Sequence, residues 1–207
     1  MSFSNVGKVW DAVSFRKHVE GLNLSWAKGI TMHHTAAPSL EQRPRGLTIQ
    51  HIRNIQYFYQ KTKQWSRGPH LFIDDDQIFG MSPLTERGIH ANSFNSSHIG
   101  IEVLGDYDEE DPNSGRGLSC WQTAAQAVAI LMELHPNLKQ INGHRDDPRT
   151  SKSCPGKKVD LDAFRLTVAD LMEGKTEEPK LSFPPHLKER LEAIEWQLKQ
   201  IRKEVGV

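Results

Sequence analysis

Strand-like and helix-like segments alternate along most of this chain. The short β-like runs lie at 29–34, 70–73, 77–80, 99–104 and 140–141. The helix-like segments lie at 14–21, 48–62, 123–134 and 161–172, while 106–118 and 142–158 are polar and predict loops. Because sheets and helices bury their apolar faces against each other, this order predicts an α/β fold, a central mixed β-sheet flanked by helices.

The pattern divides the 207 residues into four parts. We expect an N-terminal segment at 1–28, the α/β domain at 29–174, a linker at 175–183 and a C-terminal amphipathic helix at 184–207. Within that helix, apolar residues recur at alternating intervals of four and three between 187 and 205. Such a seam predicts either a homo-oligomer through residues 187–205 or docking of the helix on the domain.

The composition excludes several classes of protein. Acidic and basic residues are equal at 26 each, so no basic surface for nucleic acid is expected. No apolar run approaches the ~20 residues that cross a bilayer, so we expect no membrane insertion. The first residues lack a basic stretch followed by an apolar one, and we therefore expect synthesis in the cytoplasm without a signal peptide.

Three residues form a candidate metal site. His33 ends a β-like run, while His144 and Cys154 stand near the two ends of one polar loop. Two imidazoles and one thiolate suit zinc, and three protein ligands leave a fourth position for water. The same residue types also fit a thiol nucleophile with a histidine base. The residues alone leave both alternatives open.

Four blocks occur in a fixed order: ITMHHTAAP, GPHLFIDDDQIFG, GIHANSFNSSHIGIEVLG and INGHRDDPRTSKSCPG. Together they resemble the zinc-dependent N-acetylmuramoyl-L-alanine amidase family, which includes phage T7-type lysozyme, cytosolic anhydromuropeptide-recycling amidases and peptidoglycan recognition proteins. The resemblance spans about residues 27–170. It implies a central mixed sheet with packed helices and one zinc ion per chain, held by His33, His144 and Cys154. It also implies peptidoglycan or a muropeptide as the substrate.

The resemblance implies roles for two further residues. Lys152 stands where the T7-type members carry a catalytic lysine, and we expect it to stabilise the oxyanion. Those members carry a tyrosine where this chain has Pro69, which can transfer no proton. Other members place a glutamate on the strand that reads IGIE here. We therefore expect Glu102 to be the general base, on the sheet face opposite Ile101 and Val103.

Substrate contacts are expected from four polar residues in the matching blocks: His34, Thr35, His90 and Asn95. His34 and Thr35 could alternatively orient His33, and Asn95 could organise its own loop. The expected function is cleavage of the bond between N-acetylmuramic acid and L-alanine by a phage or prophage endolysin, which acts on the cell wall after release. The alternatives are a cytosolic muropeptide-recycling amidase and a non-catalytic peptidoglycan-binding module.

Overall fold

A six-stranded mixed sheet forms the centre of the computed structural model, which describes residues 3–175. The strands are β1 (Val9–Trp10), β2 (Gly29–His34), β3 (Leu71–Ile73), β4 (Ile78–Gly80), β5 (His98–Val103) and β6 (Gln140–Gly143). Their order in the sheet is β1-β4-β3-β5-β2-β6. Strands β3, β5, β2 and β6 are parallel to one another, whereas β4 pairs antiparallel with β3 and β1. The expected mixed sheet is confirmed.

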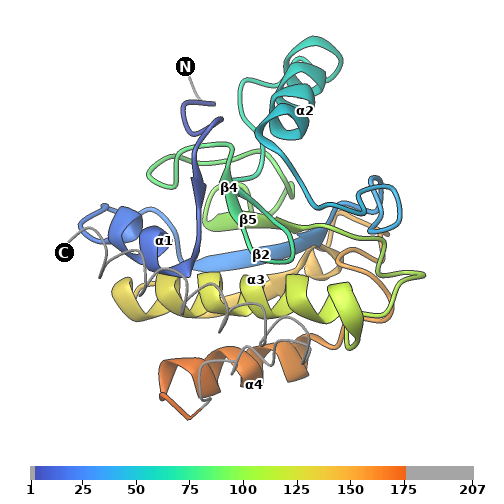
Figure 1. Cartoon of the computed structure of the whole chain (residues 1–207). Coiled ribbons are helices and arrows are strands. Elements are labelled where there is room, and N and C mark those ends of the chain that lie inside the picture. Colours follow the sequence, from blue (N-terminus) through green and yellow to red (C-terminus); the bar gives the residue numbers. More distant parts are fainter. Residues whose placement is uncertain (1–2, 176–207) are drawn as a thin grey trace, which may run out of the picture. The chain divides into compact units, whose positions relative to one another are not determined.

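Within residues 3–175, four α-helices surround the sheet: α1 (Ala12–Val19), α2 (Ile49–Lys61), α3 (Gly115–Leu134) and α4 (Leu161–Met172). Helix α3 covers one face of the sheet, α4 packs against α3, and α2 lies on the other side of the sheet (Figure 1). Helices α2 and α4 begin at side-chain caps, because Thr48 accepts from the His51 N–H and Asp160 accepts from the Ala163 N–H. The sheet therefore has one face covered by α3 and one face left for a site.

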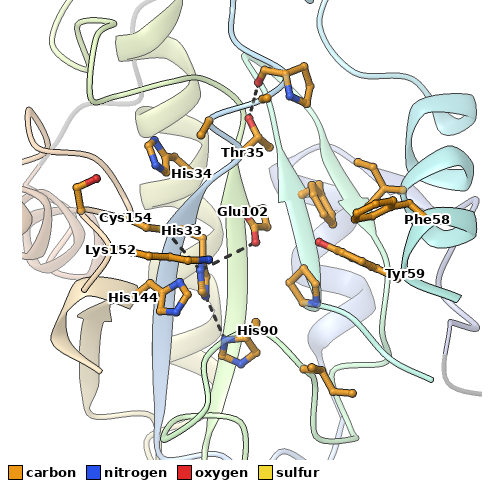
Figure 2. A pocket seen from close by; sticks show the side chains of 18 of the residues that line it. His33, His34, Thr35, Phe58, Tyr59, His90, Glu102, His144, Lys152 and Cys154 are labelled. Atoms are coloured by element: carbon orange, nitrogen blue, oxygen red, sulfur yellow. Dashed lines mark hydrogen bonds and ion pairs between the residues drawn. The ribbon is translucent and has the colours of Figure 1, made fainter. Parts of the chain in front are cut away.

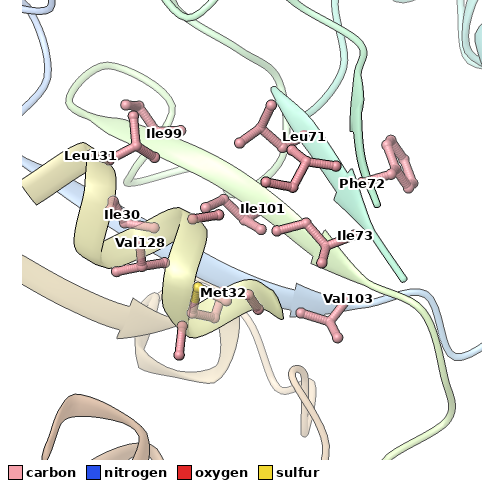
Figure 3. Close-up of a cluster of buried hydrophobic side chains, with 14 of the residues drawn as sticks. Ile30, Met32, Leu71, Phe72, Ile73, Ile99, Ile101, Val103, Val128 and Leu131 are labelled. Carbon is pink, nitrogen blue, oxygen red and sulfur yellow. The ribbon is translucent and has the colours of Figure 1, made fainter. Parts of the chain in front are cut away.

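The hydrophobic core fills the space between the sheet and α3. Alternate residues of β2 and β5 point into it, so that Ile30 and Ile101 meet Val128 and Leu131 of α3 (Figure 3). Successive side chains of a strand point to opposite faces. The alternation that buries Ile101 and Val103 therefore turns Glu102 toward the opposite face, as expected.

Helix α3 begins at Gly115, so the expectation that 106–118 is wholly a loop is wrong at its C-terminal end. Tertiary contacts extend the helix beyond its clear apolar pattern. Arg116 pairs with Asp75, with 2.5 Å between Nε and Oδ2. Gly117 packs so closely on the Asp111 carbonyl that a Cβ atom would lie 2.0 Å from that oxygen. Neither contact could be predicted from the spacing of apolar residues in the sequence.

The expected loop at 142–158 lacks regular structure only beyond residue 146. β6 extends into it as far as Gly143, and a 3-10 helix, η1 (His144–Asp146), follows. Among the described residues, no helix has the length and apolar character needed to cross a membrane. The C-terminal helix expected at 184–207, with its seam at 187–205, lies outside the described residues, as does the linker beyond residue 175.

Candidate metal centre and cleft

The three candidate metal ligands converge at the end of β2 (Figure 2). His33 comes from β2, His144 opens η1, and Cys154 lies at the far end of the following loop. One ligand atom from each residue lies within 4.8 Å of the others. The Cys154 Sγ atom is 3.6 Å from His33 Nδ1. His33 thus meets two residues that lie more than a hundred positions away in the sequence, and the three present two nitrogens and one sulfur to one point.

This spacing fits a tetrahedral metal ion. Bonds of about 2.3 Å to sulfur and about 2.05 Å to nitrogen, at a tetrahedral angle, would separate the two ligand atoms by about 3.6 Å. The Cys154 Sγ to His33 Nδ1 distance has that value. The donor set of two imidazoles and a thiol is also one that zinc prefers. The described residues can therefore hold zinc in this place.

Hydrogen bonds leave the correct nitrogen of His33 free for a metal. His90 Nε2 lies 3.1 Å from the carbonyl oxygen of His98, which can only accept, so this nitrogen carries the proton. The Nδ1 atom of neutral His90 is then an acceptor, and it lies 3.1 Å from His33 Nε2. His33 consequently donates from Nε2 and keeps a lone pair on Nδ1, the atom that faces Cys154.

Backbone contacts hold the loop that carries Cys154. The Arg145 N–H donates to the Cys154 carbonyl at 2.7 Å, and the Arg145 guanidinium donates to the carbonyls of Gly156 and Val159 at 2.9 Å each. At the start of the same loop, the Asp146 carboxylate accepts from the Gly143 N–H at 2.8 Å. These bonds bring the two ends of the loop together, so Cys154 reaches His144 across ten positions.

Glu102 lies beside His33 on the same face of the sheet. The two residues are register partners in adjacent parallel strands, and Glu102 Oε1 is 4.0 Å from His33 Nδ1. The Glu102 side chain is 14% exposed. Burial raises the pKa of its carboxyl to about 8, while the nearby Lys152 ammonium lowers it. A carboxyl with a pKa near neutrality can both accept and return a proton.

Lys152 supplies a positive charge at the rim of the cleft. It is exposed, and its side chain extends toward His33 (Figure 2). Burial is the main cause of the lowered pKa values of His33 and His144, and the Lys152 charge lowers both further. The same charge lowers the pKa of Glu102. Within residues 3–175, no hydrogen bond or ion pair engages its ammonium group. The ammonium is therefore free to interact with an anionic oxygen in the cleft.

A cleft of about 640 Å³ opens over these residues. One wall carries the polar groups described above, together with backbone and side chains of the segment after β2. The opposite wall is apolar and comes from α2 and the segment that follows it: Ile55, Phe58, Tyr59 and Trp65. This wall was not predictable from the sequence, because the helical spacing of Ile55, Phe58 and Tyr59 indicates only that they share one side of a helix.

The four expected substrate contacts have different surroundings. His34, Thr35 and His90 line the cleft, and Asn95 does not. The Asn95 amide oxygen accepts from the backbone N–H groups of His90 and Ala91, which favours the alternative that it organises its loop. His34 accepts from the Tyr107 N–H, and Thr35 donates to the Pro38 carbonyl. Both bonds stabilise the end of β2, the strand that carries His33.

The environment of Cys154 argues against a thiol nucleophile. Burial raises the pKa of the Cys154 thiol, to which the negative charge of Glu102 contributes. A nucleophilic cysteine needs the opposite, a lowered pKa that maintains the thiolate. A bound metal ion would supply the positive charge that a buried thiolate requires. Together with the convergence of His33 and His144 on Cys154, this favours Cys154 as a metal ligand.

Comparisons with known proteins agree with this arrangement. The family model described as N-acetylmuramoyl-L-alanine amidase matches residues 24–157. A mouse (Mus musculus) protein named N-acetylmuramoyl-L-alanine amidase is 28% identical over 154 residues, which are 71% of this chain and 27% of that protein. The chain thus spans about a quarter of the length of the curated relatives that it matches.

Solved structures share the fold. The N-acetylmuramoyl-L-alanine amidase LysC from Clostridium intestinale superposes with a TM-score of 0.55 at 23% identity, covering 73% of this chain and 91% of that one. Drosophila PGRP-LB superposes with a TM-score of 0.53 at 22% identity, covering 66% and 78%. At such identities these similarities establish the arrangement of the sheet and helices, and the chemistry must come from the residues in the cleft.

Proposed function

Because the chain belongs to the N-acetylmuramoyl-L-alanine amidase family, we propose that it hydrolyses the amide bond between N-acetylmuramic acid and L-alanine in bacterial peptidoglycan. The observation that carries the proposal is the meeting of His33, His144 and Cys154 beside the mostly buried carboxyl of Glu102. Three ligands with a carboxyl alongside are typical of a hydrolytic metal site rather than of a structural one.

We propose zinc as the metal, one ion per chain, held by His33 Nδ1, His144 and Cys154 Sγ. When bound, zinc polarises the scissile carbonyl and makes water a nucleophile at neutral pH. The thiolate and the two neutral imidazoles suit this ion better than magnesium or calcium, which prefer oxygen ligands. The free lone pair on His33 Nδ1 supports the assignment.

The protein's own groups would move the proton and stabilise charge. Glu102 accepts a proton from the water that attacks the carbonyl carbon, and the new C–O bond converts the carbonyl oxygen to an oxyanion. Lys152 stabilises that oxyanion from the rim of the cleft. Glu102 then returns its proton to the alanine nitrogen as the C–N bond breaks. Its raised pKa, about 8, favours this return step.

The experiment that tests the proposal combines product and metal analysis of the purified protein. Purified peptidoglycan digested by the protein should release stem peptides with new L-alanine amino termini, without new reducing sugar ends. The protein should contain about one zinc ion per chain. New reducing ends without new amino termini would show a glycosidase and contradict the proposal, as would a protein that binds peptidoglycan without cutting it.

Within this function we propose an endolysin-type role, in which the protein lyses the cell wall after release from the cytoplasm. The alternative is a recycling amidase for soluble anhydromuropeptides. A cleft of about 640 Å³ accommodates a muropeptide unit in either role, so the substrate preference decides between them. We expect the initial rate of hydrolysis to be higher on intact sacculi than on soluble anhydromuropeptides. A much higher rate on the soluble substrate would instead support the recycling role.

A further inference from the structure

Tyr59 brings a hydroxyl group into the cleft from an element that carries none of the other polar groups of the site. It belongs to the last turn of α2, and its ring forms part of the apolar wall. Its ring also packs against Trp65, with centroids 5.2 Å apart, and its carbonyl accepts from the Trp65 N–H at 2.9 Å. Contacts on both the ring and the backbone thus set the direction of the side chain.

The chain makes room for this ring at Gly68. A Cβ atom at Gly68 would lie 2.8 Å from Tyr59 Cε2 and 2.9 Å from Cδ2, which is too close for any larger residue. The next residue, Pro69, also lines the cleft but has neither an N–H nor a polar side chain to offer. The ring of Tyr59, from α2, therefore packs closely against the backbone at Gly68, shortly before β3.

The hydroxyl points along the cleft toward Glu102 (Figure 2). It makes no hydrogen bond with any residue in the described part of the chain. Burial and the charge of Glu102 both raise the pKa of the Tyr59 phenol, so the hydroxyl keeps its proton and can act as a donor. This hydroxyl, which has no partner and points toward the proposed base, can donate a hydrogen bond to the reacting group of a substrate.

We propose that Tyr59 is a catalytic residue that donates a hydrogen bond to the scissile carbonyl oxygen as this oxygen becomes negatively charged. The inference rests on the proposed function and adds a second oxyanion donor to it. Figure 2 shows Lys152 and Tyr59 on opposite sides of Glu102. The oxyanion is thus stabilised by a charged group from one wall and by a neutral donor from the other.

The test is Tyr59→Phe, with Tyr57→Phe as its matched control. Tyr57 lies on the same helix, is 65% exposed and does not line the cleft. Because loss of one oxyanion donor typically lowers turnover 10²- to 10³-fold, we expect kcat of Tyr59→Phe to fall by about 100-fold. Its KM and zinc content should stay near those of the wild type, and Tyr57→Phe should behave as the wild type in all three measurements.

A second variant tests the position of the hydroxyl without removing it. Gly68→Ala should displace the Tyr59 ring and lower kcat in a similar way, and it should cause little further loss in the Tyr59→Phe background. Independent, multiplying losses in the double variant would overturn this positional argument. Thermal unfolding and zinc content report on whether each variant keeps its fold and its metal.

The outcomes separate the two proposals. If the wild type cuts the amide bond and Tyr59→Phe turns over as fast as Tyr57→Phe, the role of Tyr59 is overturned while the amidase function stands. A rise in KM with unchanged kcat would make Tyr59 a binding residue and overturn the catalytic role. A wild type that does not cut the bond would overturn the proposed function itself.

Discussion

His33 Nε2 lies 3.1 Å from His90 Nδ1, and His90 in turn donates to the carbonyl of His98. This chain of two imidazoles and a carbonyl fixes the tautomer of His33 and leaves Nδ1 for the metal. Gly100 makes the arrangement possible, because a Cβ atom there would lie 2.4 Å from the His90 ring. His90 is thus a neighbour of the metal ligand as well as a residue of the cleft.

Removing the His90 ring should weaken zinc binding. Without an acceptor at this place, His33 can rotate or change tautomer, and such partners of metal ligands typically contribute 10- to 100-fold in affinity. We expect His90→Ala to lower zinc affinity in that range, measured by competition with a chromophoric chelator. His90→Asn places an amide oxygen near the lost Nδ1 and should restore part of the affinity. Equal affinities in all three proteins would contradict this positioning role.

Replacing Glu102 with glutamine should abolish most turnover and leave the metal in place. The amide cannot accept the proton of water, and general-base catalysis contributes about 10²- to 10⁴-fold. Glu102→Gln should therefore lose kcat in that range with about one zinc ion per chain retained. Glu20→Gln, at an exposed position that does not line the cleft, is the control. Full activity of Glu102→Gln would mean that another group is the base.

Activity should be lost when the metal is removed and also when its sulfur ligand is replaced. A chelator should inactivate the protein, and added zinc should restore it. Cys154→Ser should lose both zinc and activity, because a serine hydroxyl is a poor substitute for a thiolate. Cys120→Ser is the matched control, since Cys120 is buried beside Asp75 and does not line the cleft. Activity that resists chelation but not thiol alkylation would instead support the thiol nucleophile.

His70 should make the fold sensitive to acid. Burial lowers its pKa from 6.5 to about 4, and its Nδ1 accepts from the Gly100 N–H at 2.9 Å. His70 binds a proton more readily in the unfolded chain than in the folded one. The contribution of neutral His70 to the free energy of unfolding is therefore complete above pH 6.5 and is lost as the pH falls toward 4. At 1.36 kcal/mol per pH unit, the loss amounts to about 3 kcal/mol.

Urea unfolding at several pH values measures this effect. His70→Asn keeps an acceptor for the Gly100 N–H but does not titrate in this range. The variant should therefore lose about 3 kcal/mol less stability than the wild type between pH 7 and pH 4. Parallel curves for the two proteins would show that other groups, rather than His70, carry the acid sensitivity.

Much of the fold was predictable because it depends on local periodicity. The two-residue period of β5 was enough to place Glu102 opposite Ile101, and the alternation of elements indicated the mixed sheet. The start of α3 was not predictable in the same way. It depends on the Arg116–Asp75 pair and on the close packing of Gly117, which join segments distant in sequence.

The candidate site also has features that the sequence predicts and features that depend on tertiary packing. The amino-acid sequence by itself determined which side chains have the chemistry for zinc and proton transfer, because residue type and the order of four blocks require no coordinates. Only the tertiary structure decided that Cys154 Sγ lies 3.6 Å from His33 Nδ1, that His90 accepts a hydrogen bond from His33, and that Tyr59 reaches the cleft. The physical reason is that periodicity specifies the side of an element that faces inward, whereas distances between side chains depend on how separate elements pack.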